Sequence, residues 1–217
     1  MRETVFLVRH GHVDGIDRPS FRGRQHLQLT GPGLRQAEQT AAFIHRTARV
    51  DAVVSSPLTR CVTTASVIGH AVGLPPIPDE GLIDRDYGDW QGRSLADVQA
   101  KDPARAAAWL ADPGAEIPNG EPLQALADRV TAAFDRIVSR HAGQAVVVVG
   151  HDTVNRVILL RALGLGLEAY GRIGQAPGAV SRLGHDGKNW IVHSMNETAQ
   201  FAPGPSLGSG LNLGSAR

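Results

Sequence analysis

The sequence is short of the features that mark secreted and membrane-spanning proteins. Its 217 residues include one cysteine, so no disulfide can form within the chain, and a reducing, cytoplasmic setting is expected. No apolar run approaches the roughly 20 residues that a membrane-spanning helix needs. The first apolar segment is short and ends in Arg-His-Gly rather than in a small-residue cleavage site, which argues against a signal peptide.

Neither sign of charge is in excess. The chain has 22 basic and 21 acidic residues and a formal net charge of +1, which gives no support for binding to nucleic acid or to an anionic membrane. Arginine is nevertheless concentrated near the start, at positions 9, 18, 22, 24 and 35. This local bias indicates a small anionic ligand rather than a polymer.

Apolar runs and helix-period segments alternate along the chain, which is typical of a doubly wound α/β sheet. With 42% hydrophobic residues the chain can bury one sizeable core, and no internal repeat divides it. We expect an open, mostly parallel sheet flanked by helices, in a single domain over residues 1–202 with a flexible tail at 203–217. Strands are expected at 4–9, 52–55, 145–149, 178–184 and 189–194. Helices are expected from Thr30, after Ser56 as N-cap with Pro57 at the first helical position, and over 152–163.

No strand is expected between residues 93 and 141, where prolines separate several helical stretches. We interpret this span as a helical insertion over the ligand site.

Three apolar runs end in side chains that suit an anion site. The run at 5–8 is followed by Arg9-His10-Gly11, the run at 145–149 by Gly150-His151, and the run at 52–54 by a segment that reaches Arg60. In open α/β sheets ligands bind outside the carboxyl ends of the strands. Two histidines and two arginines are therefore expected together at one edge of the sheet.

Taken in order, the motifs resemble the histidine phosphatase superfamily, in its phosphoglycerate mutase-like branch 1. The similarity runs through LVRHG at 7–11, GRQHLQLTGPGLRQAE at 23–38, SSPLTRCVTTA at 55–65, LIDRDYGDWQG at 82–92, NGEPL at 119–123, VVVVGHDTVNRVIL at 146–159 and MNETAQF at 195–201. It covers about nine-tenths of the chain. The combination of motifs is specific, although each motif alone is weak.

The resemblance implies phosphoryl transfer through a histidine. The transferring group spreads negative charge over its oxygens, and the guanidinium groups of Arg9 and Arg60 suit those oxygens. Neutral His10 would attack phosphorus and become phosphohistidine, and protonated His151 would add a further cation. Because these groups neutralise the charge, no metal or other cofactor is expected.

Two loop residues and two carboxylates complete the candidate site. Arg22 and Gly23 lie in the loop beside the first strand and are candidates for phosphate contact. For the general acid, Asp84 occupies the place in LIDRDYGDWQG where the family usually carries glutamate, which reaches one methylene further. Asp152 directly follows His151, where this branch usually has glycine. His-Asp at that place resembles the acid phosphatase and phytase branch, in which this aspartate is the proton donor, but a helix cap is an equal alternative for Asp152.

Hydrolysis is expected rather than mutase activity. The mutases carry an extra basic segment after the G-x-W-x-G region, whereas the corresponding span here, residues 94–122, holds only Lys101 and Arg105 as cations. The mutases also carry Glu and Asn where this chain has His12 and Ile16. The expected substrate is a small phosphorylated metabolite, neither nucleic acid nor a membrane is an expected partner, and a homodimer is left open.

Alternatives from two other classes remain. His10, His12 and Asp14 match the pattern H-x-H-x-D, and His151-Asp152 could complete a cluster of ligands for a metal ion in a metal-dependent hydrolase. The fixed positive charge of two nearby arginines argues against a divalent cation there. The second alternative is a phosphate-binding pseudoenzyme that has kept the arginines but lost an efficient acid.

Overall fold

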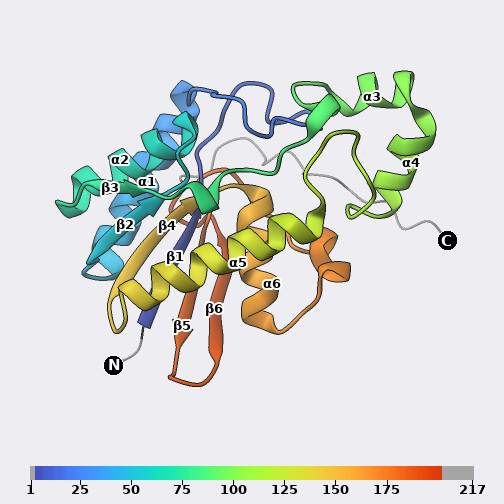
Figure 1. Cartoon of the computed structure of the whole chain (residues 1–217). Coiled ribbons are helices and arrows are strands. Elements are labelled where there is room, and N and C mark those ends of the chain that lie inside the picture. The colour runs from blue at the N-terminus through green and yellow to red at the C-terminus, as the bar shows by residue number, and fades with distance from the viewer. Residues whose placement is uncertain (1–2, 202–217) are drawn as a thin grey trace.

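A six-stranded sheet forms the centre of the computed structural model, which describes residues 3–201 and so does not include the predicted tail at 203–217. The strand order is β3-β2-β4-β1-β5-β6 (Figure 1). Strands β3, β2, β4 and β1 are parallel to one another, β5 is antiparallel to β1, and β6 is antiparallel to β5. The strands are β1 (Glu3–Arg9), β2 (Ala52–Ser55), β3 (Pro76–Pro78), β4 (Ala145–Gly150), β5 (Val180–His185) and β6 (Trp190–Glu197). The expected open, mostly parallel sheet is confirmed.

One strand, β3, was not predicted from the sequence pattern. It is three residues long, begins and ends with proline, and lies at the edge of the sheet beside β2. Proline is tolerated at a sheet edge because its missing N–H is not needed for a further strand.

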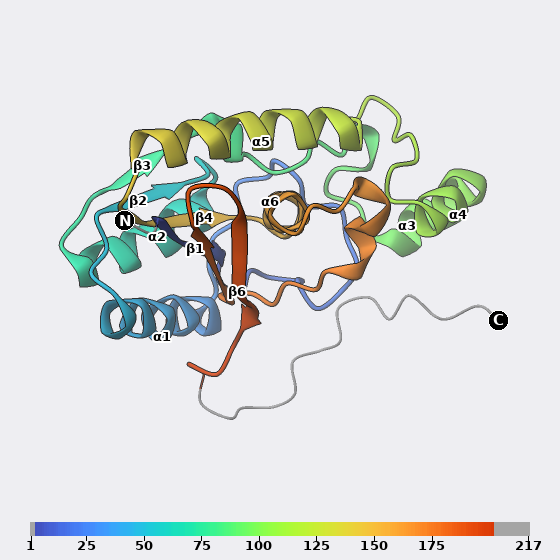
Figure 2. The same ribbon diagram turned by 90° about the horizontal axis from the view of Figure 1, so that it is seen from below.

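Helices cover both faces of the sheet (Figure 2). Helices α1 (Gly31–Thr47) and α2 (Thr59–Val72) pack on one face, and α5 (Leu123–Arg140) and α6 (Asp152–Leu163) pack on the other. The valines of β4 show the division, because Val147 and Val149 contact the first pair of helices whereas Val146 and Val148 contact the second. A continuous apolar run is typical of a strand that is covered on both faces.

The segment predicted as an insertion at 93–141 divides into two parts. Helices α3 (Leu95–Lys101) and α4 (Pro103–Ala111) lie to one side of the sheet, where they share a small core with Phe21, Trp90 and Ile117 (Figure 1). Helix α5 instead buries a stripe that includes Phe134 in the main core. The part that stands apart from the sheet therefore ends before α5. Among residues 3–201, no helix is long and apolar enough to cross a membrane.

Within residues 3–201, three short 3₁₀ helices connect the larger elements. They are η1 (Glu80–Leu82), η2 (Gly88–Trp90) and η3 (Leu167–Arg172). The first two flank the segment that carries Asp84, and the third follows α6.

The helix after β2 begins later than the sequence predicts. Ser56 and Pro57 were the expected N-cap and first helical residue, but α2 begins at Thr59 with Leu58 as its N-cap. The Ser56 hydroxyl lies 2.8 Å from Nε2 of His151 and serves the site instead of the helix. Arg60 is still in the first turn of α2, at the carboxyl edge of the sheet.

Two glycines allow α1 to approach the end of β1 closely. A Cβ atom on Gly33 would clash with the carbonyl oxygen of His12, and one on Gly11 would clash with the carbonyl oxygen of Gly33. The N-cap residue Thr30 accepts a hydrogen bond from the Gly33 amide and donates one to the His12 carbonyl. The backbone that follows His10 is therefore held against the first turn of α1.

We expect Gly33→Ala to lower the free energy of unfolding by about 1–3 kcal/mol, because the added methyl group forces the backbone apart. Urea denaturation measures this change. Gly174→Ala is the matched control, since Gly174 is exposed and its added Cβ would meet no atom within 4 Å. The control should stay within about 0.5 kcal/mol of the parent chain. Equal stability of the two variants would contradict the close approach.

Candidate active site

The carboxyl ends of β1, β4 and β2 lie side by side, since β1 pairs with β4 and β4 pairs with β2. Arg9 at the end of β1 lies opposite Gly150 at the end of β4. His10 and His151 follow these two strands, and Arg60 comes from the helix after β2. All three side chains are buried. The structure thus brings together the two histidines and two arginines that the strand ends predicted.

The imidazole of His10 has one ring nitrogen engaged and one left over. Its Nδ1 lies 2.7 Å from the carbonyl oxygen of Gly11, which can only accept, so Nδ1 carries the hydrogen and donates it. Burial, followed by the positive charges of Arg60 and Arg9, holds the pKa of His10 well below its ordinary value of 6.5. At neutral pH the ring is therefore uncharged, with the lone pair on Nε2.

His151 lies edge-on to His10, with 5.5 Å between the ring centres. Its Nε2 is 2.8 Å from Oγ of Ser56, and its Nδ1 is 3.5 Å from Oδ2 of Asp84. Burial, followed by the charges of the two arginines, also lowers the pKa of His151 well below 6.5. This ring is therefore uncharged at neutral pH. It would act as the expected third cation only if the charge of a bound anion raised its pKa.

The two arginines present donors that no described residue satisfies. Arg60 is fully buried and donates to the carbonyl oxygens of Gln25 at 2.6 Å and Gly23 at 2.8 Å, and to Oδ2 of Asp84 at 2.9 Å. Arg9 donates through Nη1 to the carbonyl oxygen of Gln175. The buried Nε atoms of both arginines have no partner among residues 3–201. Because an unpaired buried charged donor is costly, these N–H groups favour an anion between them.

The two loop candidates take different places. Arg22 is half-buried and donates to the carbonyl oxygens of Gly15 and Arg18. Burial, and then the charges of Arg9 and Arg60, lower the pKa of Arg22, so its guanidinium lies near both. Gly23 has φ at +48°, and a Cβ there would lie 2.9 Å from the carbonyl oxygen of Arg85. Gly23 therefore shapes the position of Arg60 through its carbonyl.

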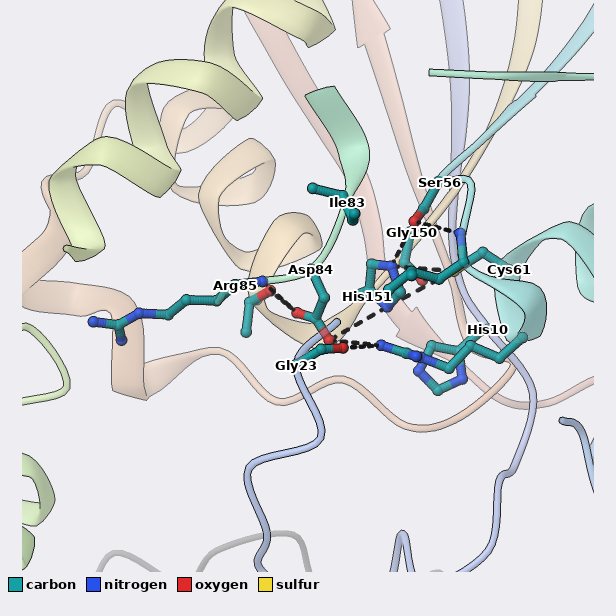
Figure 3. Close-up of polar contacts among 12 residues, drawn as sticks. His10, Gly23, Ser56, Cys61, Ile83, Asp84, Arg85, Gly150 and His151 are labelled. Atoms are coloured by element: carbon teal, nitrogen blue, oxygen red, sulfur yellow. Dashed lines mark hydrogen bonds and ion pairs between the residues drawn. The ribbon is translucent and has the colours of Figure 1, made fainter. Parts of the chain in front are cut away.

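The two candidate acids, Asp84 and Asp152, differ in their contacts. Asp84 is buried at the centre of the site, where Oδ1 accepts from the Thr153 hydroxyl at 2.5 Å and from the Arg85 amide at 2.9 Å. The Arg85 side chain points away from this centre (Figure 3). Asp152 instead lies 3.0 Å from Nε of Arg156, one turn along α6. The capping interpretation of Asp152 is wrong, because His151 is the N-cap and Asp152 is already helical.

The segment that carries Asp84 is held by residues that the sequence analysis did not single out. Arg129 of α5 donates to the carbonyl oxygens of Ile83 at 2.7 Å and Asp84 at 3.0 Å, and to that of Gly81. The Glu121 carboxylate accepts two hydrogen bonds from this guanidinium, at 2.6 and 2.8 Å. Glu121 lies in the NGEPL motif, which was the available signal, whereas nothing in the helical pattern marked Arg129.

The H-x-H-x-D pattern does not form a metal-binding cluster. The His12 ring lies 2.8 Å from Oγ1 of Thr30 and 3.4 Å from Oδ2 of Asp17. Among residues 3–201 no group of three or more His, Cys, Asp or Glu side chains is placed to hold a metal ion. Cys61 is buried beside the Gly150 carbonyl, and burial raises the pKa of its thiol to about 12, so it is no thiolate at neutral pH.

The chain belongs to the histidine phosphatase superfamily, branch 1, which it matches over residues 5–198. It is 33% identical over 162 residues to the bifunctional protein Rv2228c of Mycobacterium tuberculosis, covering 75% of this chain but only 44% of that relative. It is 28% identical to phosphoserine phosphatase 1 of Hydrogenobacter thermophilus, with 91% and 93% of the two chains covered. The alpha-ribazole phosphatase structure from Shigella flexneri matches with a TM-score of 0.81 and 26% identity, over 91% and 96% of the chains.

The buried histidines should make the stability of the protein depend on pH. Below about pH 6.5 the unfolded chain protonates His10 and His151, whereas the folded chain, with its lowered pKa values, does not. The free energy of unfolding should therefore fall as the pH falls, by up to about 1.4 kcal/mol per pH unit for each histidine. In urea denaturation series, His10→Gln should reduce this slope by up to that amount. An unchanged slope would contradict a neutral, buried His10.

Proposed function

We propose that this chain hydrolyses small phosphomonoesters through a phosphohistidine on His10, without a metal ion. The observation that carries the proposal is the neutral His10 ring with a free Nε2, beside two guanidinium groups whose Nε–H donors are unused. Branch 1 membership supports it, as do the names of the phosphoserine and alpha-ribazole phosphatases among the relatives. The buried Cys61 fits a reducing, cytoplasmic setting.

The reaction takes place in two balanced steps. Arg9 and Arg60, assisted by Arg22, hold the phosphoryl oxygens and stabilise their charge in the transition state. Nε2 of His10 forms a bond to phosphorus while the bond from phosphorus to the alcohol oxygen breaks, and Asp84 acts as the general acid that gives a proton to that oxygen. The Asp84 carboxylate then takes a proton from water as the water oxygen attacks phosphorus. Phosphate leaves and His10 is again neutral.

Hydrolysis is favoured over mutase activity by the low positive charge of residues 94–122. Of the two cations in this span, Lys101 and Arg105, Arg105 is paired with Asp102 at 2.8 Å, which leaves little positive charge for a second phosphate. The metal-dependent alternative gains no support from the separated His12 side chain. The pseudoenzyme alternative differs in having no turnover, which kinetics detects directly.

His10→Ala should abolish both turnover and the acid-labile phosphoenzyme, because no other described side chain offers a free nucleophile between the arginines. Rapid acid quench after mixing with labelled phosphomonoester measures the phosphoenzyme. His70→Ala, which removes an exposed imidazole from α2, is the control and should keep parent activity. Near-parent rates in His10→Ala would refute the proposal. If the parent protein forms a stoichiometric phosphoenzyme that does not turn over, the pseudoenzyme alternative is supported instead.

The general acid should show itself through the leaving group. Loss of a general acid costs about 10²–10⁴-fold for an alcohol that leaves poorly, whereas a nitrophenolate leaves without a proton. We therefore expect Asp84→Asn to cripple hydrolysis of an alkyl phosphate and largely to spare p-nitrophenyl phosphate. Asp152→Asn should act on p-nitrophenyl phosphate and a simple alkyl phosphate to the same small extent. The reverse pattern would transfer the acid role to Asp152.

A further inference from the structure

A second polar cluster lies beside the proposed catalytic groups, and the mechanism does not use it. The Asp152 carboxylate is paired with Arg156 at 3.0 Å, and Nη1 of Arg156 donates to the carbonyl oxygen of Tyr170 at 3.1 Å. The Arg156 guanidinium also lies over the Tyr170 ring, 5.2 Å from its centre. The side chain of Asp152 is 31% exposed, so the ion pair is accessible to a bound molecule.

Two tyrosines add hydroxyl groups: Tyr170 contacts Arg156 directly, and Tyr87 comes from the Asp84 segment. Tyr87 follows the Asp84 segment and packs against Phe21, with 5.2 Å between the ring centres. Neither the Tyr87 nor the Tyr170 hydroxyl hydrogen-bonds to another described residue. Burial, and then the negative charge of Asp84, raise the pKa of Tyr87, while burial and the neighbouring Tyr87 raise that of Tyr170. Both phenols therefore remain protonated and are free to donate.

The position of the cluster fits the alcohol half of a phosphomonoester. Asp152 is the residue after His151 in the chain, and among the charges acting on Arg9 its carboxylate is the strongest. Besides burial, the negative charge of Asp84 likewise raises the pKa of the Tyr87 phenol. The cluster thus includes residues that directly follow His151 and the Asp84 segment, and Nδ1 of His151 lies 3.5 Å from Oδ2 of Asp84. The leaving oxygen and its substituent must lie beside these groups.

We propose that Tyr87, Asp152, Arg156 and Tyr170 form the leaving-group subsite, and that it selects uncharged, hydroxyl-rich alcohols such as sugars and polyols. This inference rests on the proposed phosphatase function.

The chemistry of the cluster carries this choice. One carboxylate and one guanidinium balance each other, so the subsite has no net charge for an ionic substituent to pair with. A carboxylate on the alcohol would meet the like charge of Asp152 beside Arg156, and an ammonium group would meet the like charge of Arg156 beside Asp152. A hydroxyl group, in contrast, can donate to Asp152 and accept from either phenol. Each such hydrogen bond is expected to contribute about five- to tenfold in kcat/KM.

The test compares ribose 5-phosphate with tetrahydrofurfuryl phosphate, which keeps the ring oxygen and the phosphorylated CH₂ group but lacks the ring hydroxyls. The parent protein should hydrolyse ribose 5-phosphate with a kcat/KM at least about tenfold higher. Tyr170→Phe and Arg156→Gln should each lower kcat/KM for ribose 5-phosphate by about five- to tenfold and change that for tetrahydrofurfuryl phosphate less than about twofold.

Two features make this test interpretable. Tyr170→Phe removes a hydroxyl that has no hydrogen bond to the described chain, so the fold should be kept, and thermal unfolding checks this. Arg161→Gln is the control on the same helix, because Arg161 pairs with Asp135 at 2.6 Å instead of with Asp152. This variant should leave kcat/KM unchanged for both probes.

Equal kcat/KM values for the two probes in the parent protein would overturn the subsite, as would an unchanged preference in both variants. A higher kcat/KM for O-phosphoserine than for ribose 5-phosphate would overturn the uncharged class of alcohol. Failure of the parent protein to form phosphohistidine with any of these probes counts against the proposed function itself, and so is distinguishable from failure of the subsite.

Discussion

The buried guanidinium of Arg60 is the interaction on which the arrangement of the site depends. Removing a guanidinium from water is expensive unless it is paired and hydrogen-bonded, and here three acceptors from two separate segments surround it. Two acceptors are carbonyls of the loop after β1, and the third is Asp84. Because all three must converge on one cation, the loop, the start of α2 and the candidate acid are fixed relative to one another. The unpaired Nε–H remains for a ligand.

The positive charge of the two arginines also sets the protonation state of the two histidines. Arg9 and Arg60 lower the pKa of His10 and of His151, reinforcing the effect of burial. The charges of the proposed phosphate site therefore also keep its candidate nucleophile unprotonated, so one set of charges serves both purposes. The Gly11 carbonyl completes the effect by fixing the hydrogen on Nδ1 of His10. Neither histidine needs a carboxylate base to be deprotonated.

The site residues at the strand ends could be predicted from the sequence, whereas contacts between segments distant in sequence could not. The runs before His10 and His151 are continuous and apolar, and parallel pairing places their carboxyl ends together whatever the details of the loops. The hydrogen bonds by which Arg129, paired with Glu121, holds the Asp84 segment depend on how α5 crosses that segment. No local sequence pattern encodes this crossing. For the same reason α5 was grouped with the insertion, although its apolar stripe packs on the sheet. The start of α2 was misplaced because the Ser56 hydroxyl bonds to His151.

Asp84 and Asp152 show how chain proximity differs from proximity in space. Asp152 is covalently next to His151, but the first turn of α6 directs its carboxylate toward Arg156, four residues on, where an i,i+4 pair forms readily. Asp84 is far away in sequence, yet Arg60, Thr153 and the backbone hold it within 3.5 Å of the His151 ring. An aspartate at the position after the histidine is therefore compatible with a branch 1 site that keeps its acid on the other segment. In the proposed subsite, that aspartate alters the charge and the hydrogen-bonding groups beside Arg156, and with them the kind of alcohol that can bind.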